Sequence, residues 1–436
     1  MKELDEQFHV TKKDADEIIA RFHDEMRRGL RGGESSLKMI PAYIGNPSGH
    51  EKGSFIGVDL GGTNLRVFVV DLDGAGKYKT KMHQVSMAKS GEYNYTKDVS
   101  REEFFDFIVG QVTGFLVNEG YSLNEPYNLG FTFSFPAEQR GIDSGRLIKW
   151  TKEWAVPGVE GEDVVKLLQE GFVRNGKNKI KVTAMINDTV ATELMLAYKE
   201  EHCGMALIYG TGTNMCVLLP TEQVVKLSGY SLKNIILNAE SGGFDKLPRN
   251  YFDEELDRQC GTKGQVLEKM VSGKYLGELA REVFAKLVDE RKLFSGKYGN
   301  IFSKVNAVNT IQMSKIEADK SGGLENVEKI LRDMNINDSS MQDRKLVQDA
   351  CAIVSTRSAK IIAIKISAFV KWLDPELREE HTVAVDGSIY ENYYGIKNRV
   401  NDMLSEILGE KANGKVRLEL AKDASGIGAA IAAAIV

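Results

Sequence analysis

The chain has 436 residues, of which 42% are hydrophobic and 27% charged, and its formal net charge is −5. This length predicts two or three domains with a large core, and a mildly acidic chain without a basic block gives no reason to expect nucleic acid or an anionic membrane as a partner. Residues 1–7 lack the apolar stretch of a secretory signal, and the longest apolar run, residues 427–436, is too short to span a bilayer. The widely spaced cysteines form no Cys-x-x-Cys pair. We therefore expect reduced thiols and a cytoplasmic location.

Two capping boxes mark early helices. Thr11 with Asp14 opens a helix that should end at the glycine pair 32–33, and its apolar face consists of Ile18, Phe22, Met26 and Leu30. Ser100 with Glu103 opens another, whose apolar face consists of Phe104, Ile108, Val112 and Phe115. Both patterns indicate helices that pack on a core.

Two similar motifs each lie between apolar runs. Residues 59–64 read Asp-Leu-Gly-Gly-Thr-Asn, and residues 211–214 read Thr-Gly-Thr-Asn. Both are expected to be hairpin turns, because the flanking runs predict strands at 55–58, 65–70, 205–208 and 215–219. Glycines at such a turn let backbone N–H groups approach an anion, and the threonine hydroxyl adds a donor. This chemistry suits the phosphates of ATP.

A single glycine turn of this kind would most often serve only to connect the two strands of a hairpin. Because the glycine motif occurs twice, the sequence instead favours one nucleotide bound between two lobes. The sequence contains no Gly-x-x-x-x-Gly-Lys-Ser/Thr loop, and no Gly-x-Gly-x-x-Gly that joins a strand to a helix with an acidic partner downstream. P-loop and Rossmann cofactor sites are therefore unsupported. The repeat indicates the duplicated, actin-like ATPase architecture.

Strand and helix patterns alternate along the rest of the chain, as is typical of α/β proteins. Strands are predicted at 129–135 and 180–186, and a helix follows at Thr189. Because the strand and hairpin pattern restarts at Met205, we place the junction between the lobes within residues 184–204. Beyond it we expect a mostly helical segment 251–372 with a long helix 344–371, surface loops near 315–323 and 335–343, a strand 382–386, and a last helix that opens at Ser425.

Polar side chains follow the predicted strands, which is where α/β folds place ligand groups. Asp188 lies where the strand 180–186 passes into a helix, so it is a candidate general base; the alternative is that it only caps that helix. Lys152 taken alone would most often be a solvated lysine. An uncharged polyol needs many hydrogen-bonding partners around one cleft, and the further candidates are Ser134, Thr151, Lys152, Glu240 and Glu268.

Nine segments match, in the same order, motifs of the eukaryotic-type hexokinases, which the chain resembles over nearly its whole length: 37–41, 59–64, 132–136, 150–152, 187–189, 210–214, 268–278, 386–388 and 425–426. One further motif departs from that family. Where the family usually has Glu-Trp-Gly, residues 240–242 read Glu-Ser-Gly. Loss of the aromatic ring is expected to loosen the pocket around Glu240 and to alter the sugar preference.

The resemblance implies an α/β, two-lobed, actin-like (ribonuclease H-like) duplicated fold with a cleft between a small and a large domain. The small lobe would comprise residues 49–184 and the C-terminal helix 425–436, and the large lobe residues 185–424 and the N-terminal helix 1–48. The implied reaction is the ATP-dependent phosphorylation of a hexose, with glucose in first place, at its 6-hydroxyl, the first step of glycolysis. ATP and Mg²⁺ would take part.

The resemblance also implies roles for individual residues. Asp188 would take the proton from the 6-hydroxyl, with Lys152 as the second catalytic residue. The sugar site would consist of Ser134, Phe135, Thr151, Lys152, Asn187, Asp188, Asn214, Glu240 and Glu268. The nucleotide would be held by Asp59, Gly61, Gly62, Thr63, Asn64, Arg66, Thr211, Gly273, Lys274, Gly387, Ser388, Ser425 and Gly426. Asp59 would position Mg²⁺ through water.

Two other functions stay open. One is a kinase of the same fold that prefers another sugar, which the serine at position 241 favours. The other is a sugar-binding regulator without catalysis, although the proposed base, the lysine and both phosphate loops are present. A hexose is the expected partner of a chain that is a monomer or a homodimer.

Overall fold

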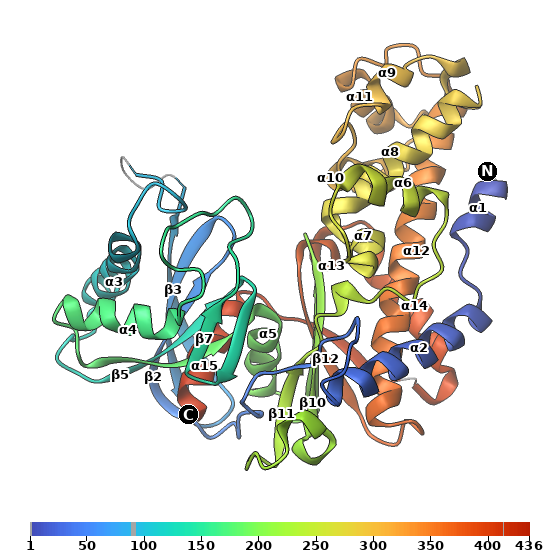
Figure 1. Cartoon of the computed structure of the whole chain (residues 1–436). Helices are drawn as coiled ribbons and strands as arrows, with labels where there is room; N and C mark the ends of the chain where they lie inside the picture. The colour runs from blue at the N-terminus through green and yellow to red at the C-terminus, as the bar shows by residue number, and fades with distance from the viewer. Residues whose placement is uncertain (1, 89–92, 413) are drawn as a thin grey trace.

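Two mixed β-sheets with flanking helices form the protein (Figure 1). The structure is a computed structural model that describes residues 2–88, 93–412 and 414–436. The five-stranded sheet has the order β4-β3-β2-β5-β8, with bounds β2 (Lys52–Leu60), β3 (Asn64–Asp73), β4 (Tyr78–Ser86), β5 (Tyr127–Phe133) and β8 (Ile180–Ile186). The six-stranded sheet has the order β1-β11-β10-β9-β12-β13, with bounds β1 (Ile40–Pro41), β9 (Cys203–Tyr209), β10 (Thr213–Pro220), β11 (Asn234–Asn238), β12 (His381–Asp386) and β13 (Val416–Leu420). A separate hairpin joins β6 (Ala137–Gly141) to β7 (Ser144–Leu147).

The same strand arrangement occurs in both sheets. Strand β2 pairs antiparallel with β3 and parallel with β5. Strand β9 likewise pairs antiparallel with β10 and parallel with β12. The two glycine motifs form the β2–β3 and β9–β10 turns, so both hairpin predictions are confirmed. This repetition, with helices packed on the sheets, is the two-domain, actin-like α/β fold expected from the sequence.

Helices pack against the sheets, and α1, α2 and the helices from α6 to α14 lie together on the right of Figure 1. Their bounds are α1 (Lys2–Phe8), α2 (Lys12–Leu30), α3 (Arg101–Asn118), α4 (Val164–Arg174), α5 (Asp188–Ala197), α6 (Tyr251–Cys260), α7 (Val266–Val271), α8 (Gly273–Asp289), α9 (Gly299–Phe302), α10 (Thr310–Ala318), α11 (Glu325–Asp333), α12 (Met341–Leu373), α13 (Ser388–Asn392), α14 (Ile396–Leu408) and α15 (Ala424–Ile435). Both predicted capping boxes are present, at the starts of α2 and α3. Among the described helices, none is long and apolar enough to cross a membrane.

Some predicted boundaries are wrong. The loop expected at 315–323 begins only after Ala318, because the polar residues before it lie on α10. The loop expected at 335–343 ends at Ser340, whose side chain caps α12. The strand expected to reach Phe135 ends at Phe133. Charged residues on a solvent-facing helical surface resemble a loop in sequence, which explains the first error.

Helices α5 and α15 form the layer between the two sheets. Helix α15 contacts β2, β3, β5 and β8, while α5 contacts α15 and strands β9 to β12. Glycines make the approach of α15 possible. A Cβ on Gly57 would lie 1.9 Å from the carbonyl oxygen of Gly426, and one on Gly130 would lie 1.8 Å from that of Ala429. The lobe boundaries at residues 184 and 185 stay a prediction, but the C-terminal helix does pack on the five-stranded sheet.

A carboxyl group is buried in this layer. Glu193 of α5 has no exposed surface, and its Oε2 accepts a hydrogen bond from the Sγ of Cys216 at 3.2 Å. Its Oε1 has no hydrogen-bond partner among the described residues. Burial raises the pKa of Glu193 from 4.5 to about 8. The carboxyl group is therefore neutral in the folded protein at pH 7.

This burial predicts that Glu193→Gln changes the pH dependence of stability. Between pH 4.5 and about 8 the folded protein holds a proton that the unfolded chain has lost. The free energy of unfolding therefore falls as the pH rises, by up to about 1.4 kcal/mol per pH unit. Because glutamine does not titrate, the variant should gain stability relative to the wild type between pH 5.5 and pH 8. Thermal unfolding at the two pH values measures this difference, with Glu34→Gln at an exposed carboxylate as the control.

Candidate active site

An ion pair with a buried carboxylate joins β2 and β3 beside the first glycine turn. Asp59 is 2% exposed, and Arg66 donates to its Oδ2 from Nε at 2.9 Å and from Nη2 at 2.5 Å. Burial raises the pKa of Asp59, and the charge of Arg66 acts in the opposite direction. Arg66 Nη1 also lies 3.5 Å from Asp423 Oδ1, which precedes α15. The pair thus ties the first glycine turn to the C-terminal helix.

The first glycine turn contacts the segment that carries Lys152. The turn is closed by Gly61 N, which donates to Asn64 O at 3.1 Å, while Thr63 is exposed and its carbonyl accepts from Met87 N at 3.0 Å. Trp154 Nε1 donates to the carbonyl of Gly62 at 2.9 Å. A Cβ on Gly62 would lie 2.9 Å from Cδ of Lys152. The structure therefore brings the predicted phosphate loop and the predicted catalytic lysine together.

Lys152 also reaches the end of β5. Its Nζ donates to the carbonyl oxygen of Ser134 at 2.9 Å and lies 5.2 Å from the ring centre of Phe135. Thr151 accepts a hydrogen bond from Trp154 N through its carbonyl oxygen, at 3.1 Å. The predicted sugar residues Ser134, Phe135, Thr151 and Lys152 thus form one cluster beside the first glycine turn.

Asp188 does not cap helix α5. The cap is Asn187, whose Oδ1 accepts from Val190 N at 2.9 Å. Asp188 is the first residue of the helix, and its Oδ1 accepts from Thr189 N at 2.7 Å. Among the described residues, none donates a hydrogen bond to its Oδ2, and the side chain is partly exposed. The alternative that Asp188 serves only as a cap is therefore wrong, and one of its carboxylate oxygens accepts no hydrogen bond from the residues that the structure describes.

A hydrogen-bonded chain joins the second glycine turn to Glu240. Asn214 Nδ2 donates to Asn238 Oδ1 at 2.8 Å, and Asn238 Nδ2 donates to Glu240 Oε1 at 2.7 Å. Ser241 N donates to Asn214 Oδ1 at 3.1 Å. Glu240 has a left-handed backbone with φ +52°, which turns the chain at this point. Burial raises the pKa of Glu240.

Glu268 lies against the same turn from the side of α7. Its Oε2 accepts from Thr213 N at 3.1 Å, and burial raises the pKa of this carboxyl group. A Cβ on Gly212 would lie 2.7 Å from Oε2 of Glu268. The structure thus brings Asn214, Glu240 and Glu268 together into a second cluster of predicted sugar residues.

The predicted nucleotide-binding residues near the six-stranded sheet lie together on the other side of the second glycine turn. Gly273 N donates to Gly210 O at 2.8 Å, and Lys274 N donates to Thr211 O at 3.1 Å. Gly387 has φ +129°, and a Cβ there would lie 2.4 Å from the carbonyl carbon of Tyr209. Ser388, which is exposed, begins α13 directly after it.

Ser425 and Gly426 are packed more tightly against the rest of the protein than residues that only contact a nucleotide need to be. Ser425 is 6% exposed, and its carbonyl accepts from Thr132 Oγ1 at 2.7 Å. A Cβ on Gly426 would lie 2.0 Å from the ring of Phe68. Close packing of α15 alone therefore accounts for the glycine, and a contact of either residue with nucleotide stays a prediction.

The charge of Asp188 acts on carboxyl groups of both sheets. It raises the pKa of Asp59 at the end of β2 and the pKa of Glu240 after β11. It also acts on Asp386 at the end of β12, whose pKa is raised to about 6, mainly by burial. Asp386 is a further candidate for the site that was not predicted from the sequence. Its position at a strand end before Gly-Ser is the same signal that identified Asp188.

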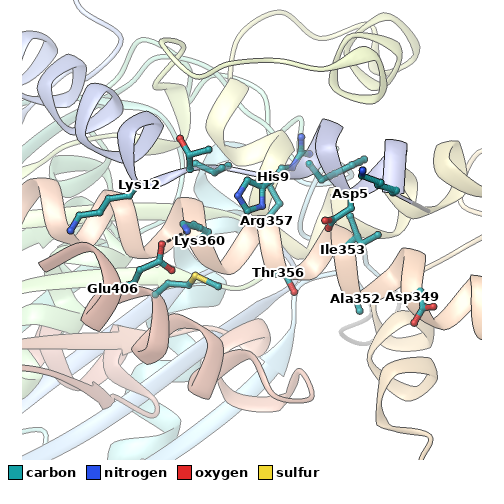
Figure 2. Close-up of a pocket in the computed structure, with 15 residues that line it drawn as sticks. Asp5, His9, Lys12, Asp349, Ala352, Ile353, Thr356, Arg357, Lys360 and Glu406 are labelled. Atoms are coloured by element: carbon teal, nitrogen blue, oxygen red, sulfur yellow. Dashed lines mark hydrogen bonds and ion pairs between the residues drawn. The ribbon is translucent and has the colours of Figure 1, made fainter. Parts of the chain in front are cut away.

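A cavity elsewhere does not belong to this arrangement. A cavity of about 730 Å³ lies between α1, the start of α2, α12 and α14. Figure 2 shows the side chains that line it. Two of its basic groups are paired: Lys360 Nζ lies 2.7 Å from Glu406 Oε1, and Arg357 binds Asp253 with both terminal nitrogens. None of the predicted site residues lines it.

Comparison with known proteins identifies the family. Sequence models described as hexokinase match residues 1–198 and 204–435. Hexokinase-7 of Oryza sativa subsp. japonica is 36% identical, covering 96% of this chain and 93% of its own length. Hexokinase-1 of Schizosaccharomyces pombe is 33% identical, covering 100% of this chain and 90% of its own length. The solved hexokinase of Schistosoma mansoni complexed with glucose is 33% identical, with a TM-score of 0.84 over 99% of this chain and 97% of that one. The chain therefore belongs to the hexokinase family and is a hexose-phosphorylating enzyme with a two-domain, actin-like fold.

Proposed function

We propose that this enzyme transfers the γ-phosphoryl group of ATP to the 6-hydroxyl of a hexose, with glucose as the preferred sugar. The observation that carries the proposal is the position of Asp188. Its Oδ2 accepts no hydrogen bond from the described residues, and its charge acts on the pKa of carboxyl groups from both sheets. A group in such a position can accept a proton from a ligand that lies between the two halves.

The proposed reaction needs one proton transfer and one displacement. Asp188 takes the proton of the 6-hydroxyl while that oxygen forms a bond to the γ-phosphorus. The bond from this phosphorus to the bridging β-oxygen breaks, and ADP leaves. Lys152, whose ammonium group now donates to Ser134 O at 2.9 Å, supplies positive charge beside the transferred group. Such a reaction depends on positioning and charge neutralisation more than on covalent catalysis.

The two sugar clusters and the two glycine turns define the binding groups. The clusters offer hydroxyl, amide and carboxylate partners to a polyol, from Ser134 and Thr151 on one side and Asn214, Glu240 and Glu268 on the other. The phosphates of ATP would contact the backbone of residues 61–64 and 211–212 and the side chain of Lys274. Residues 387–388 and 425–426 would complete the nucleotide site.

The residues present fit a magnesium ion held mainly through substrate. No three His, Cys, Asp or Glu residues in the described ranges are grouped so as to hold a metal by themselves. Magnesium in kinases usually keeps several waters and is bound through one or two carboxylates and the phosphates of the nucleotide. Asp59, whose second carboxylate oxygen is not used by Arg66, is suited to such a contact through water. When bound, the ion would neutralise charge on the phosphates.

A kinase for another hexose is the second candidate, and Ser241 favours it. This residue is fully buried directly beside Glu240, at the position where the resemblance places a tryptophan. A smaller side chain there leaves the Glu240 turn supported by hydrogen bonds to Asn214 and Asn238 instead of by a ring. Glucose nevertheless takes first place, because the related Schistosoma mansoni enzyme was solved in complex with glucose.

A panel of hexoses tests the proposal. Purified protein with ATP and Mg²⁺ is assayed for sugar-dependent ADP formation, and kcat/KM is measured for glucose, mannose, fructose and galactose. We expect the highest value for glucose. A higher value for another hexose would establish the second candidate. Binding of glucose by calorimetry without any ADP formation would instead show a sugar-binding regulator.

The compartment and the oligomeric state stay predictions. A cytoplasmic location agrees with the sequence analysis, while the relatives include Hexokinase-4 of Oryza sativa subsp. japonica, which is named chloroplastic. Light scattering of the purified chain distinguishes the monomer from the homodimer.

A further inference from the structure

One lysine lies fully buried in the C-terminal third of α12. Lys365 has no exposed surface and follows the buried apolar residues Ile361, Ile362 and Ile364. Burial lowers its pKa to about 7. Removing an ammonium group from water is costly for folding, so its presence here calls for a reason other than stability.

The ammonium group of Lys365 contacts the support of the second sugar cluster. Its Nζ donates to Thr213 Oγ1 at 2.7 Å and lies 3.5 Å from Ser241 Oγ. Thr213 N in turn donates to Glu268 Oε2, and Ser241 N donates to Asn214 Oδ1. The charges of Glu268 and Lys365 also act on one another, each favouring the charged form of the other.

These contacts join three segments that are far apart in sequence. Thr213 belongs to the β9–β10 turn, Ser241 to the turn after β11, and Glu268 to α7. Each segment carries one of the predicted sugar ligands Asn214, Glu240 and Glu268. Lys365 is therefore one hydrogen bond away from the groups that would hold the sugar.

We propose that Lys365 is a positioning residue for the sugar site, which holds these three segments together through its contacts with Thr213 and Ser241. The inference rests on the proposed function and adds a residue of α12 to it. Because Lys365 is fully buried, it acts through Thr213, Ser241 and Glu268.

A purely structural role predicts a different behaviour on substitution. A methionine has a similar length and no charge, so Lys365→Met removes the cost of burying an ammonium group while it keeps most of the packing. If Lys365 served the fold, the variant would lose stability. If it positions the sugar site, the variant should keep or gain stability and lose sugar affinity.

The experiment compares Lys365→Met with Lys360→Met in the full chain. Lys360 is a mostly buried lysine on the same helix that pairs with Glu406, away from the predicted site residues. We expect Lys365→Met to raise the KM for the preferred hexose about 10- to 100-fold, as is typical for loss of a charged hydrogen bond. Its kcat and its KM for ATP should change less than about 5-fold, and its thermal midpoint should not fall. Lys360→Met should leave the KM for the sugar within about 2-fold of wild type.

Three outcomes overturn the inference. An unchanged KM for the sugar in Lys365→Met would show that the contact has no positioning role. A lower thermal midpoint with unchanged kinetics of the folded enzyme would assign Lys365 to stability. A wild-type protein that neither binds nor phosphorylates any hexose would refute the proposed function, and the inference would fall with it. Calorimetric titration of the sugar separates this last outcome from the others.

Discussion

Replacing Asp188 by asparagine or alanine should lower kcat by about two to four orders of magnitude. The carboxylate is the proposed acceptor of the sugar proton, and asparagine at the same position is not basic. Asparagine retains an oxygen that can accept from Thr189 N, as Oδ1 now does at 2.7 Å, so the start of α5 should be preserved. Steady-state kinetics with the preferred hexose at saturating ATP measures the effect.

Sugar binding provides the control for the Asp188 variants. Calorimetric titration should show a much smaller loss of sugar affinity than of kcat, because several other groups hold the sugar. Turnover near the wild-type value in a folded Asp188→Asn protein would remove Asp188 from the mechanism. A loss of sugar affinity with kcat unchanged at saturating sugar would assign Asp188 to sugar binding alone.

Local signals in the sequence predicted much of the fold. The hairpin turns β2–β3 and β9–β10 could be found because glycines separate two apolar runs within about twenty residues. The helices α2 and α3 begin at capping boxes whose reciprocal hydrogen bonds are present in the structure. Strand β8 and the position of Asp188 after it followed from a short apolar run that ends in polar residues.

Other elements gave no such local signal. Strands β6 and β7 are short and largely polar, so their pattern does not differ from that of a loop. Strand β13 has only five residues. Although Val416, Leu418 and Leu420 lie on one face and pack against the core, its parallel pairing with β12, which precedes it by about thirty residues, has no local signal. Pairing between such distant segments is a tertiary property that local patterns do not report.

The residues of the candidate site also divide into those that local motifs predict and those whose contacts depend on tertiary packing. Asp188, Lys152 and the glycine turns could be predicted from motifs, whereas the contact of Glu268 with the backbone of Thr213 depends on how α7 packs. Lys365 was missed because it lies within an apolar helical run, where a single lysine suggests a helix boundary or a solvated face. Gly426 was assigned to the nucleotide, yet its contact with Phe68 shows that helix packing already requires a glycine there.

Valine at Gly212 should lower kcat/KM for the sugar by about two orders of magnitude. A Cβ at this position would lie 2.7 Å from Oε2 of Glu268, so the carboxylate must leave its hydrogen bond with Thr213 N. The same side chain would occupy space beside the backbone groups proposed to bind phosphate. Valine at Gly62 should have a smaller effect of about 10-fold, because it displaces the flexible side chain of Lys152, whose Cδ would lie 2.9 Å away. Initial rates over a matrix of sugar and ATP concentrations separate the two losses.

Gly110→Val is the matched control for these variants. Gly110 lies exposed on α3, and among the described residues no atom beyond its chain neighbours and the adjacent helix backbone lies within 4 Å of the position that its Cβ would take. Neither Gly62, Gly110 nor Gly212 has a left-handed backbone, so the three variants differ mainly in the space that the valine enters. The control should retain wild-type kinetics. If Gly62→Val and Gly212→Val both left the ATP kinetics unchanged as well, the two turns would not be phosphate loops. A loss of sugar affinity alone in Gly212→Val would assign that turn to the support of Glu268.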